Sequence, residues 1–309
     1  MLATIAAIVL IAGQGTTSPY PIKPSDTDPA IKQFDGPHLI YFNATAKPRK
    51  QLFVFLPGTN GKPGGTNLFC QTAADLGYQT ISLAYPTDTS ATVVRNVPSE
   101  KAFENFRLEI IEGRDLSPAI QVDRTNSIEN RLIKLLQYLN KREPGKGWDR
   151  YLDAKGELSW SQIAFAGQSQ GGGHAVLLAF RHRVARAIAT GGPKDFDRVR
   201  NRPAAWYHDP ATPTSLIFTF NHELDEQGCN IQEQFQICKQ MGLYEFGPPV
   251  SVDKSSPPYK SRILTTNFPG SPTDSVRAHT SVSGDRGTPK DADGKPIFRK
   301  VWEWMMTAG

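Results

Sequence analysis

The stretch WSQIAFAGQSQGGGHA, residues 160–175, contains the pattern that decides the fold. A short apolar run leads into Gly167-Gln168-Ser169-Gln170-Gly171, and small residues then open a helix. This G-x-S-x-G pattern is typical of a buried strand that turns sharply into a helix with an exposed serine at the turn. Its two glycines remove Cβ atoms that would clash across so tight a turn. The alternative is an ordinary glycine-rich turn with a solvated serine, but the strand before it and the helix after it favour Ser169 as a nucleophile.

Outward from this turn, apolar runs alternate with helical patterns, which predicts an α/β fold with a mostly parallel central sheet and helices on both faces. Besides the run before Ser169, we expect strands at His38 to Asn43 (an early edge strand), Gln51 to Leu56, Thr80 to Ala84, Val184 to Thr190, Ser215 to Phe220 and Arg262 to Thr266. We expect helices at Thr66 to Leu76, Ser127 to Lys141, Gln170 to His182 and Lys300 to Met306. Residues 87–123 show no clear period and are interpreted as a long irregular region.

Composition narrows the classes of function. The 309 residues carry 35 basic and 30 acidic side chains, a net charge of +5 spread along the chain. No basic block interleaved with aromatic residues marks a nucleic-acid surface, so we expect no nucleic-acid partner. No His/Cys cluster suggests a zinc site, and we expect neither a metal nor a cofactor.

The N-terminus indicates export. Leu2 to Gly13 is apolar but too short to span a membrane, which is typical of the core of a secretory signal, although the usual basic residue before it is missing. We therefore predict a signal peptide over residues 1–15, a polar extension over 16–36 and one catalytic domain over 37–309. The mature protein is expected to be secreted or periplasmic, without stable membrane association.

The chain has three cysteines. If the protein is exported, Cys229 and Cys238 are the expected disulfide pair, clamping a local loop. A continuous helix between them would separate them by about 13 Å, so a bridge requires a break there. Cys70 lies in an expected helix and is interpreted as a buried small hydrophobic residue.

A serine nucleophile needs a base and an acid that orients the base. In this strand–turn–helix context the partners follow in the order Ser, Asp or Glu, His. His279, the only histidine after His222, is therefore the predicted base and is expected in a loop before the final helix. Asp225, just past the strand that ends at Phe220, is the preferred acid, with Glu223 as its rival. His222 lies on the acid's own turn and is a poor candidate for the base.

Attack on an ester carbonyl places negative charge on oxygen, which backbone amides must receive. One donor is expected to be the amide of Gln170, directly after the nucleophile. The other is expected from the loop Pro57-Gly58-Thr59-Asn60-Gly61, where we choose the amide of Thr59. The alternative for that loop is an ordinary Gly/Asn/Pro-rich turn.

The ordered set LPGTNG, GQSQGGGHA, NHELDE and AHTS resembles the α/β-hydrolase superfamily, in its secreted or periplasmic serine-esterase branches. It also resembles a bacterial group with an LPGT loop, a G-H-S-Q-G-G elbow and a late AH-[ST] motif. The resemblance implies an α/β-hydrolase fold, with Ser169 as nucleophile, Asp225 as acid, His279 as base, and an oxyanion hole from the amides of Thr59 and Gln170. Gln168 departs from the histidine often found before the serine, and Pro57 stands where many lipases have histidine.

We therefore predict a serine esterase that cleaves a small-molecule or polymeric carboxylic ester through an acyl-enzyme. A peptidase or amidase with the same triad is the alternative enzyme. A non-catalytic α/β-hydrolase relative acting as a binding protein is the alternative outside enzymes, although such relatives usually lose a triad member.

Overall fold

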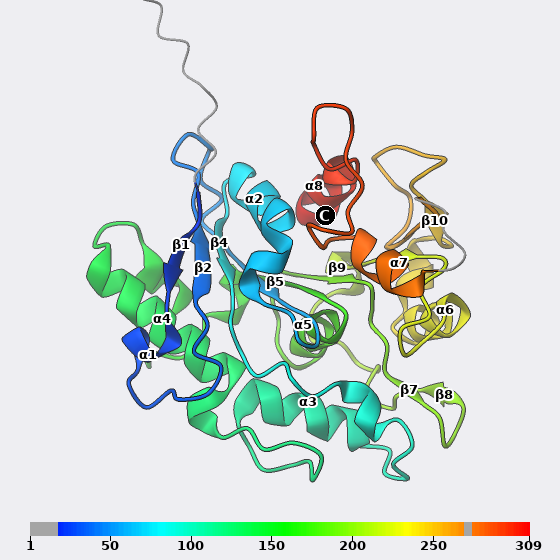
Figure 1. Ribbon diagram of the computed structural model, residues 1–309, viewed down its shortest axis with the longest axis horizontal. Helices are drawn as coiled ribbons and strands as arrows, with labels where there is room; N and C mark the ends of the chain where they lie inside the picture. Colours follow the sequence, from blue (N-terminus) through cyan, green and yellow to red (C-terminus); the bar gives the residue numbers. More distant parts are fainter. Residues whose placement is uncertain (1–17, 269–273) are drawn as a thin grey trace, which may run out of the picture.

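A computed structural model of the protein describes residues 18–268 and 274–309; the predicted signal sequence lies outside this part of the chain. Nine strands form one sheet in the order β1-β2-β4-β3-β5-β6-β9-β11-β10. The first three strands pair antiparallel to one another, and all other neighbours are parallel. The prediction of a mostly parallel α/β sheet is confirmed (Figure 1).

The strands match the apolar runs closely. They are β1 Tyr20–Ile22, β2 His38–Tyr41, β3 Leu52–Leu56, β4 Gln79–Ser82, β5 Ile163–Gln168, β6 Arg186–Thr190, β9 Ile217–His222, β10 Val250–Ser251 and β11 Ile263–Thr266, with a separate hairpin of β7 Phe196–Asp197 and β8 Arg202–Pro203. Strand β2 is not the edge strand that its alternation predicted. Tyr20 pairs with Ile40, so β1 covers that edge and makes β2 an inner strand.

Helices cover both faces of the sheet, as predicted. They are α1 Pro24–Thr27, α2 Asn67–Asp75, α3 Ala102–Glu112, α4 Ile128–Arg142, α5 Gln170–Arg181, α6 Ile231–Gln240, α7 Ser275–Ser281 and α8 Arg299–Thr307. Strand β3 explains the two layers, because its successive side chains point to opposite faces. Its leucines and valine join the core formed with α3, α4 and α5, whereas its phenylalanines join the core formed with α2 and α8.

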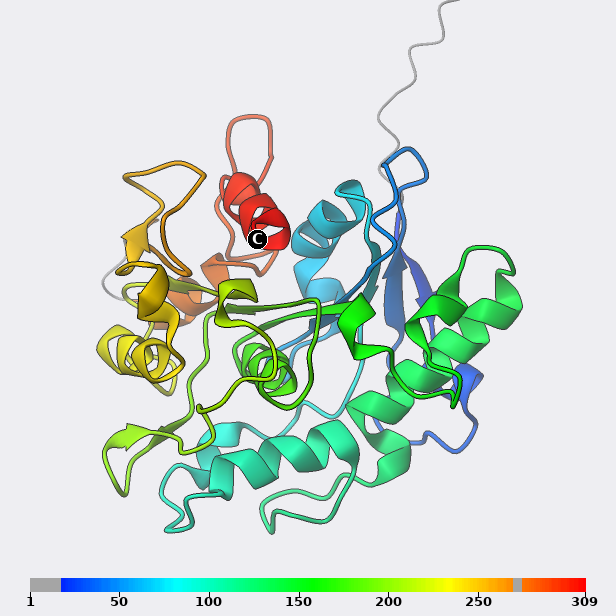
Figure 2. The ribbon, with the colours of Figure 1, turned by 180° about the vertical axis from the view of Figure 1, so that it is seen from behind.

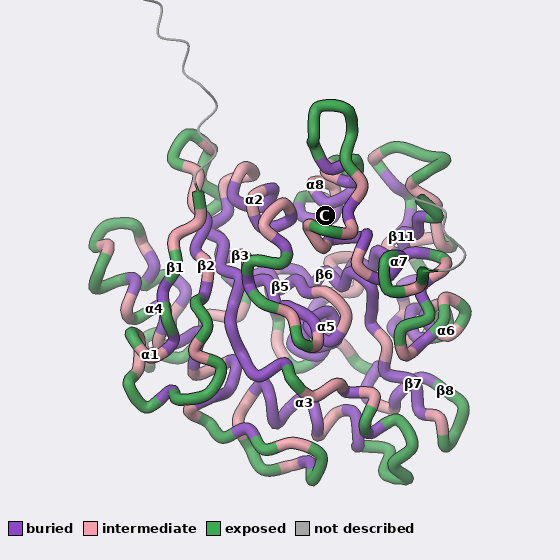
Figure 3. Tube along the Cα trace, in the orientation of Figure 1, coloured by how far each residue is buried: buried purple, intermediate pink, exposed green. Residues whose placement is uncertain are grey.

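Both views show the two layers, with α2 and α8 on one side of the sheet and α3, α4 and α5 on the other (Figure 2). Burial is concentrated in the central strands and in α5, while the rim loops are exposed (Figure 3). Within the described ranges, no helix combines the length and the apolar character needed to cross a membrane.

The segment 87–123 is more ordered than its sequence indicated, because it contains α3. Phe103, Phe106 and Ile110 lie on a helical period and are buried, as the period requires. The period is obscured because Arg107 and Glu109 are also buried, at 1 % exposure each. The Glu109 carboxylate accepts the backbone N–H groups of the loop that follows the helix, at 2.7–3.1 Å. Charged residues at core positions therefore hid this helix from a hydrophobicity argument.

Candidate active site

The predicted elbow is present at the end of β5. Ser169 has φ 56° and ψ −118°, a conformation that a residue with a side chain rarely adopts, and it is the N-cap of α5. A Cβ atom at Gly167 would overlap the backbone of Gly171, and one at Gly171 would overlap the carbonyl of Leu56. Both glycines are therefore required by the close approach of the turn to itself and to β3. This packing holds Ser169 at the carboxyl end of the central strand.

The structure brings His279 and Asp225 together. The Nδ1 atom of His279 lies 2.7 Å from Oδ2 of Asp225, 54 residues earlier in the chain, and the Asp225 side chain is fully buried. An aspartate at this nitrogen fixes the ring so that its other nitrogen, Nε2, is the one left to face a nucleophile. Burial raises the pKa of Asp225. The hydrogen bond from His279 and the charge of Lys194 lower the pKa by more than burial raises it, so it lies below its usual value.

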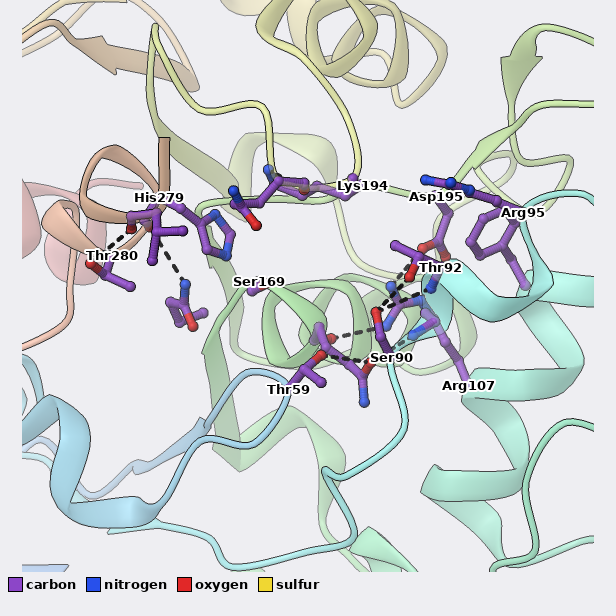
Figure 4. A pocket seen from close by; sticks show the side chains of 17 residues that line it. Thr59, Ser90, Thr92, Arg95, Arg107, Ser169, Lys194, Asp195, His279 and Thr280 are labelled. Carbon is purple, nitrogen blue, oxygen red and sulfur yellow. Dashed lines mark hydrogen bonds and ion pairs between the residues drawn. The ribbon is translucent and has the colours of Figure 1, made fainter. Parts of the chain in front are cut away.

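His279 and Ser169 line the same cavity (Figure 4). Both also adjoin the glycine pair Gly191-Gly192. A Cβ atom at Gly191 would lie 3.1 Å from Cε1 of His279, and one at Gly192 would lie 3.2 Å from the carbonyl oxygen of Ser169. The chain after β6 therefore has no side chain at the two positions where it passes the elbow and the imidazole. This leaves room for the two functional groups to share one cavity.

His279 does not lie in a loop, as its sequence context predicted, but near the end of α7. Asp274 caps that helix by accepting a hydrogen bond from the backbone N–H of Arg277 at 2.9 Å. The helix is only seven residues long, which is too short for a clear hydrophobic period. The position of the His279 ring is consequently set by a helix rather than by a loop.

The other candidates for acid and base have different partners. The Glu223 carboxylate accepts a hydrogen bond from the Thr265 hydroxyl at 3.0 Å, on the neighbouring strand β11. The buried ring of His222 accepts the backbone N–H of Leu224 at 3.1 Å within its own turn. The described contacts therefore join Asp225, and not its rival Glu223, to His279.

Two loops converge on the residue after the serine. A Cβ atom at Gly58 would overlap the side chain of Gln168, so the loop after β3 touches the elbow and holds Thr59 beside it. The Oε1 atom of Gln170 accepts the Thr59 hydroxyl at 3.2 Å and the backbone N–H of Ala91 at 2.8 Å. The predicted oxyanion residues, Thr59 and Gln170, are thus hydrogen-bonded to each other. The first backbone N–H groups of a helix such as α5 have no intrahelical acceptor and are free to receive an anion.

A buried ion pair, which the sequence analysis missed, contacts the backbone of the elbow. Arg107 on α3 makes a bidentate pair with Asp195 at 2.6 Å for each nitrogen, and its Nη1 donates to the carbonyl oxygen of Gln170 at 2.9 Å. Trp206 donates to the same carboxylate at 3.0 Å. Burial lowers the pKa of Arg107, but the charge of Asp195 outweighs burial and raises it. The helical spacing of Phe103, Phe106 and Ile110 was the signal that could have revealed α3.

Lys194 is a second buried residue beside the candidate site that the sequence analysis missed. Its Nζ atom lies 2.8 Å from Oδ2 of Asp225, and its side chain is only 9 % exposed. Burial lowers the pKa of Lys194, while the charge of Asp225 opposes that change. The available signal was its position, two residues beyond Gly192 at the carboxyl end of β6, where parallel strands carry their binding residues.

The cavity in front of Ser169 has a volume of about 460 Å³. Most of the residues that line it are polar, and they come from the loop after β3, the turn at residues 90–92, α3, the elbow, the chain after β6, the turn at residues 227–228 and α7. Apolar side chains in that lining are limited, among the described residues, to Ala91, Phe103 and Val276. No set of three His, Cys, Asp or Glu residues in the described ranges is grouped to hold a metal ion.

The predicted disulfide between Cys229 and Cys238 is absent, which corrects the sequence analysis. Both thiols are free and buried, as is that of Cys70. The reason is the helix α6, which Asn230 opens with a capping box and which continues unbroken past Cys238. A helix rises about 1.5 Å per residue, so the two sulfurs are held apart. Burial raises the pKa of Cys238 to about 12.

Comparison with known proteins adds no family assignment. No protein-family model matches the chain, and a search of curated proteins finds no match.

Proposed function

We propose that the protein is a serine hydrolase of the α/β-hydrolase type that cleaves carboxylic esters through an acyl-enzyme. The observation that carries the proposal is the strained Ser169 in one cavity with His279, whose Nδ1 atom is hydrogen-bonded to the buried Asp225. The order Ser169, Asp225, His279 along the chain is the order expected of that superfamily. The loop after β3, which reaches the elbow, is also where such enzymes hold an oxyanion donor.

In the proposed reaction, the hydroxyl of Ser169 attacks the ester carbonyl while Nε2 of His279 takes the hydroxyl proton. The carbonyl oxygen becomes an anion, which the backbone N–H groups of Thr59 and Gln170 receive. The bond to the alcohol then breaks, and the imidazolium returns the proton to the departing alkoxide. Water, deprotonated by the same imidazole, hydrolyses the acyl-enzyme and restores the serine. Asp225 keeps its negative charge throughout and orients the ring.

The cavity lining supports short or polar acyl groups. An aliphatic chain gains affinity by burying apolar surface, at about 25 cal/mol per Å². Apart from Ala91, Phe103 and Val276, the described residues that line the cavity are polar residues and Gly228, so a long aliphatic chain would lie mainly against polar residues. We therefore expect hydrolysis of acetyl and butyryl esters to exceed that of long-chain esters.

Labelling with a serine-directed fluorophosphonate tests the proposal. The probe phosphonylates a serine only when a base activates it, so mapping of the labelled peptide is expected to identify Ser169. The peptide containing Ser283, a buried serine bonded to Thr190 at 2.7 Å, is the internal control and is expected to stay unlabelled. Absence of label on Ser169 in folded protein that also fails to hydrolyse acetyl esters would contradict the proposal.

A further inference from the structure

Asp225 contacts two side chains that carry, or can acquire, a positive charge. Its Oδ2 atom lies 2.7 Å from Nδ1 of His279 and 2.8 Å from Nζ of Lys194. The side chains of both partners are almost buried, at 11 % and 9 % exposure, so water screens their charges weakly. An Asp–His pair alone needs no lysine to orient the ring. The third member therefore requires an explanation of its own.

Lys194 also fastens the turn that carries the acid. Its Nζ atom donates to the carbonyl oxygen of Gln227 at 2.9 Å and reaches that of Cys229 at 3.5 Å. The other oxygen of Asp225, Oδ1, accepts the backbone N–H of Gln227 at 2.9 Å. The Lys194 ammonium thus contacts the carboxylate of Asp225 and the backbone carbonyls of Gln227 and Cys229, which lie later in the same turn. Lys194 therefore restrains the acid turn, where Cys229 and Cys238 form no bridge.

Lys194 also changes the electrostatics of the imidazole. The elbow presents Gln168 and Ser169 to the His279 side of the cavity, and neither is charged. On its own helix, Asp274 and Arg277 are exposed, where solvent screens them. Arg107 and Asp195 also line the cavity, but they are buried and paired with each other. The charges bonded to the ring and to its partner oxygen are those of Asp225 and Lys194. A cation on the shared oxygen opposes a second cation on the ring.

We propose that Lys194 is a positioning residue that holds Asp225 for His279 and keeps the imidazole neutral at lower pH than an Asp–His pair alone would. This rests on the proposed hydrolase function for its effect on catalysis, but its effect on the ring does not depend on turnover. Only a neutral imidazole accepts the serine proton, so Lys194 extends activity toward acidic pH. It also reduces the freedom of the carboxylate to rotate away from the ring.

The test compares the pH profile of kcat/KM for p-nitrophenyl acetate in wild type, Lys194→Met and Lys194→Arg. Lys194→Met is expected to move the acid limb to higher pH by at least about half a unit, because the opposing charge is gone. It is also expected to lower kcat about tenfold, since the acid turn is less restrained. Lys194→Arg retains a cation and is expected to bring the limb back toward wild type. Lys141→Met, an exposed lysine on α4, is the matched control.

A merely structural role predicts a different result. If Lys194→Met loses activity and melting temperature but its acid limb stays within about 0.2 pH units of wild type, the electrostatic role is wrong. Titration of the histidine rings by NMR, with His279→Gln assigning the signal, makes the same comparison without substrate. An upward shift of that titration in Lys194→Met supports the proposal even if no ester is hydrolysed. No shift overturns it whether or not the enzyme is active.

Discussion

Two buried groups of charged residues contribute to the cavity in front of Ser169, and they are built differently. In the first, called here the upper group, Asp225 is bonded to His279 and Lys194. In the second, the lower group, Arg107 and Asp195 form a bidentate pair, with side chains only 2 % and 1 % exposed, that contacts the elbow through the carbonyl oxygen of Gln170. The upper group includes a histidine, whereas the lower group consists of an arginine and an aspartate held in one ion pair. The group that we propose to do chemistry therefore differs in kind from the group that supports the elbow.

The largest expected effect concerns the proposed chemistry. Ser169→Ala removes the nucleophile, and we expect kcat to fall by more than about a thousandfold, the scale seen when triad members are removed. The melting temperature should stay nearly unchanged, because alanine keeps the Cβ atom and therefore the same backbone strain. Thr280→Val, another change of a cavity-lining hydroxyl, is the matched control and should alter kcat only a few-fold. Near-parent turnover by Ser169→Ala would show that the elbow is not the site of chemistry.

The second effect belongs to the lower group. Arg107→Met leaves the Asp195 carboxylate buried without its main partner, and we expect a loss of about 3–5 kcal/mol in the free energy of unfolding. The exposed pair of Glu104 and Arg181 joins the same two helices, α3 and α5. Arg181→Met should therefore cost less than about 1 kcal/mol, as surface pairs do. Urea titrations of both variants measure the difference. Equal losses would mean that the buried pair of Arg107 and Asp195 contributes no more to stability than the surface pair does.

The third prediction separates the two candidate acids. Asp225→Asn should lower kcat about a hundredfold or more, because an amide cannot fix the ring in the required tautomer. Glu223→Gln should change kcat less than about threefold, since its partner is Thr265 and an amide oxygen still accepts that hydrogen bond. Steady-state kinetics on one acetyl ester measures both. A larger loss in Glu223→Gln than in Asp225→Asn would move the acid to Glu223.

The fourth prediction concerns stability and pH. Since folding lowers the pKa of Asp225, its carboxylate stabilises the fold above the unfolded value of about 3.9. That contribution is lost as the pH falls through the lower folded value. The difference in melting temperature between wild type and Asp225→Asn should thus shrink as pH decreases from about 6 to 3. A difference that is constant with pH would mean that folding does not lower the pKa of Asp225.

The sequence predicted those parts of the structure whose buried residues are apolar, and it failed where the buried residues are charged. The inner strands and the helices α2, α4, α5 and α8 were predicted because their buried positions are apolar and periodic. The serine, and the histidine and aspartate that contact each other, followed from motif and order. Arg107 and Lys194 were missed because a buried charge looks like a surface residue until its partner, 88 or 31 positions away, is known.

The smallest expected effect is that of a reductant. The free thiols of Cys229 and Cys238 are held apart by the helix α6, so the acid turn depends on Lys194 and not on a bridge. Treatment with dithiothreitol should change the melting temperature by less than about 1 °C, whereas loss of a disulfide closing a loop of this size would cost roughly 2.5 kcal/mol. Alkylation without reductant should add three groups to the unfolded chain and none to the folded one, because all three cysteines are buried. A single adduct on the unfolded chain would reveal a bridge and return the restraint of Asp225 to it.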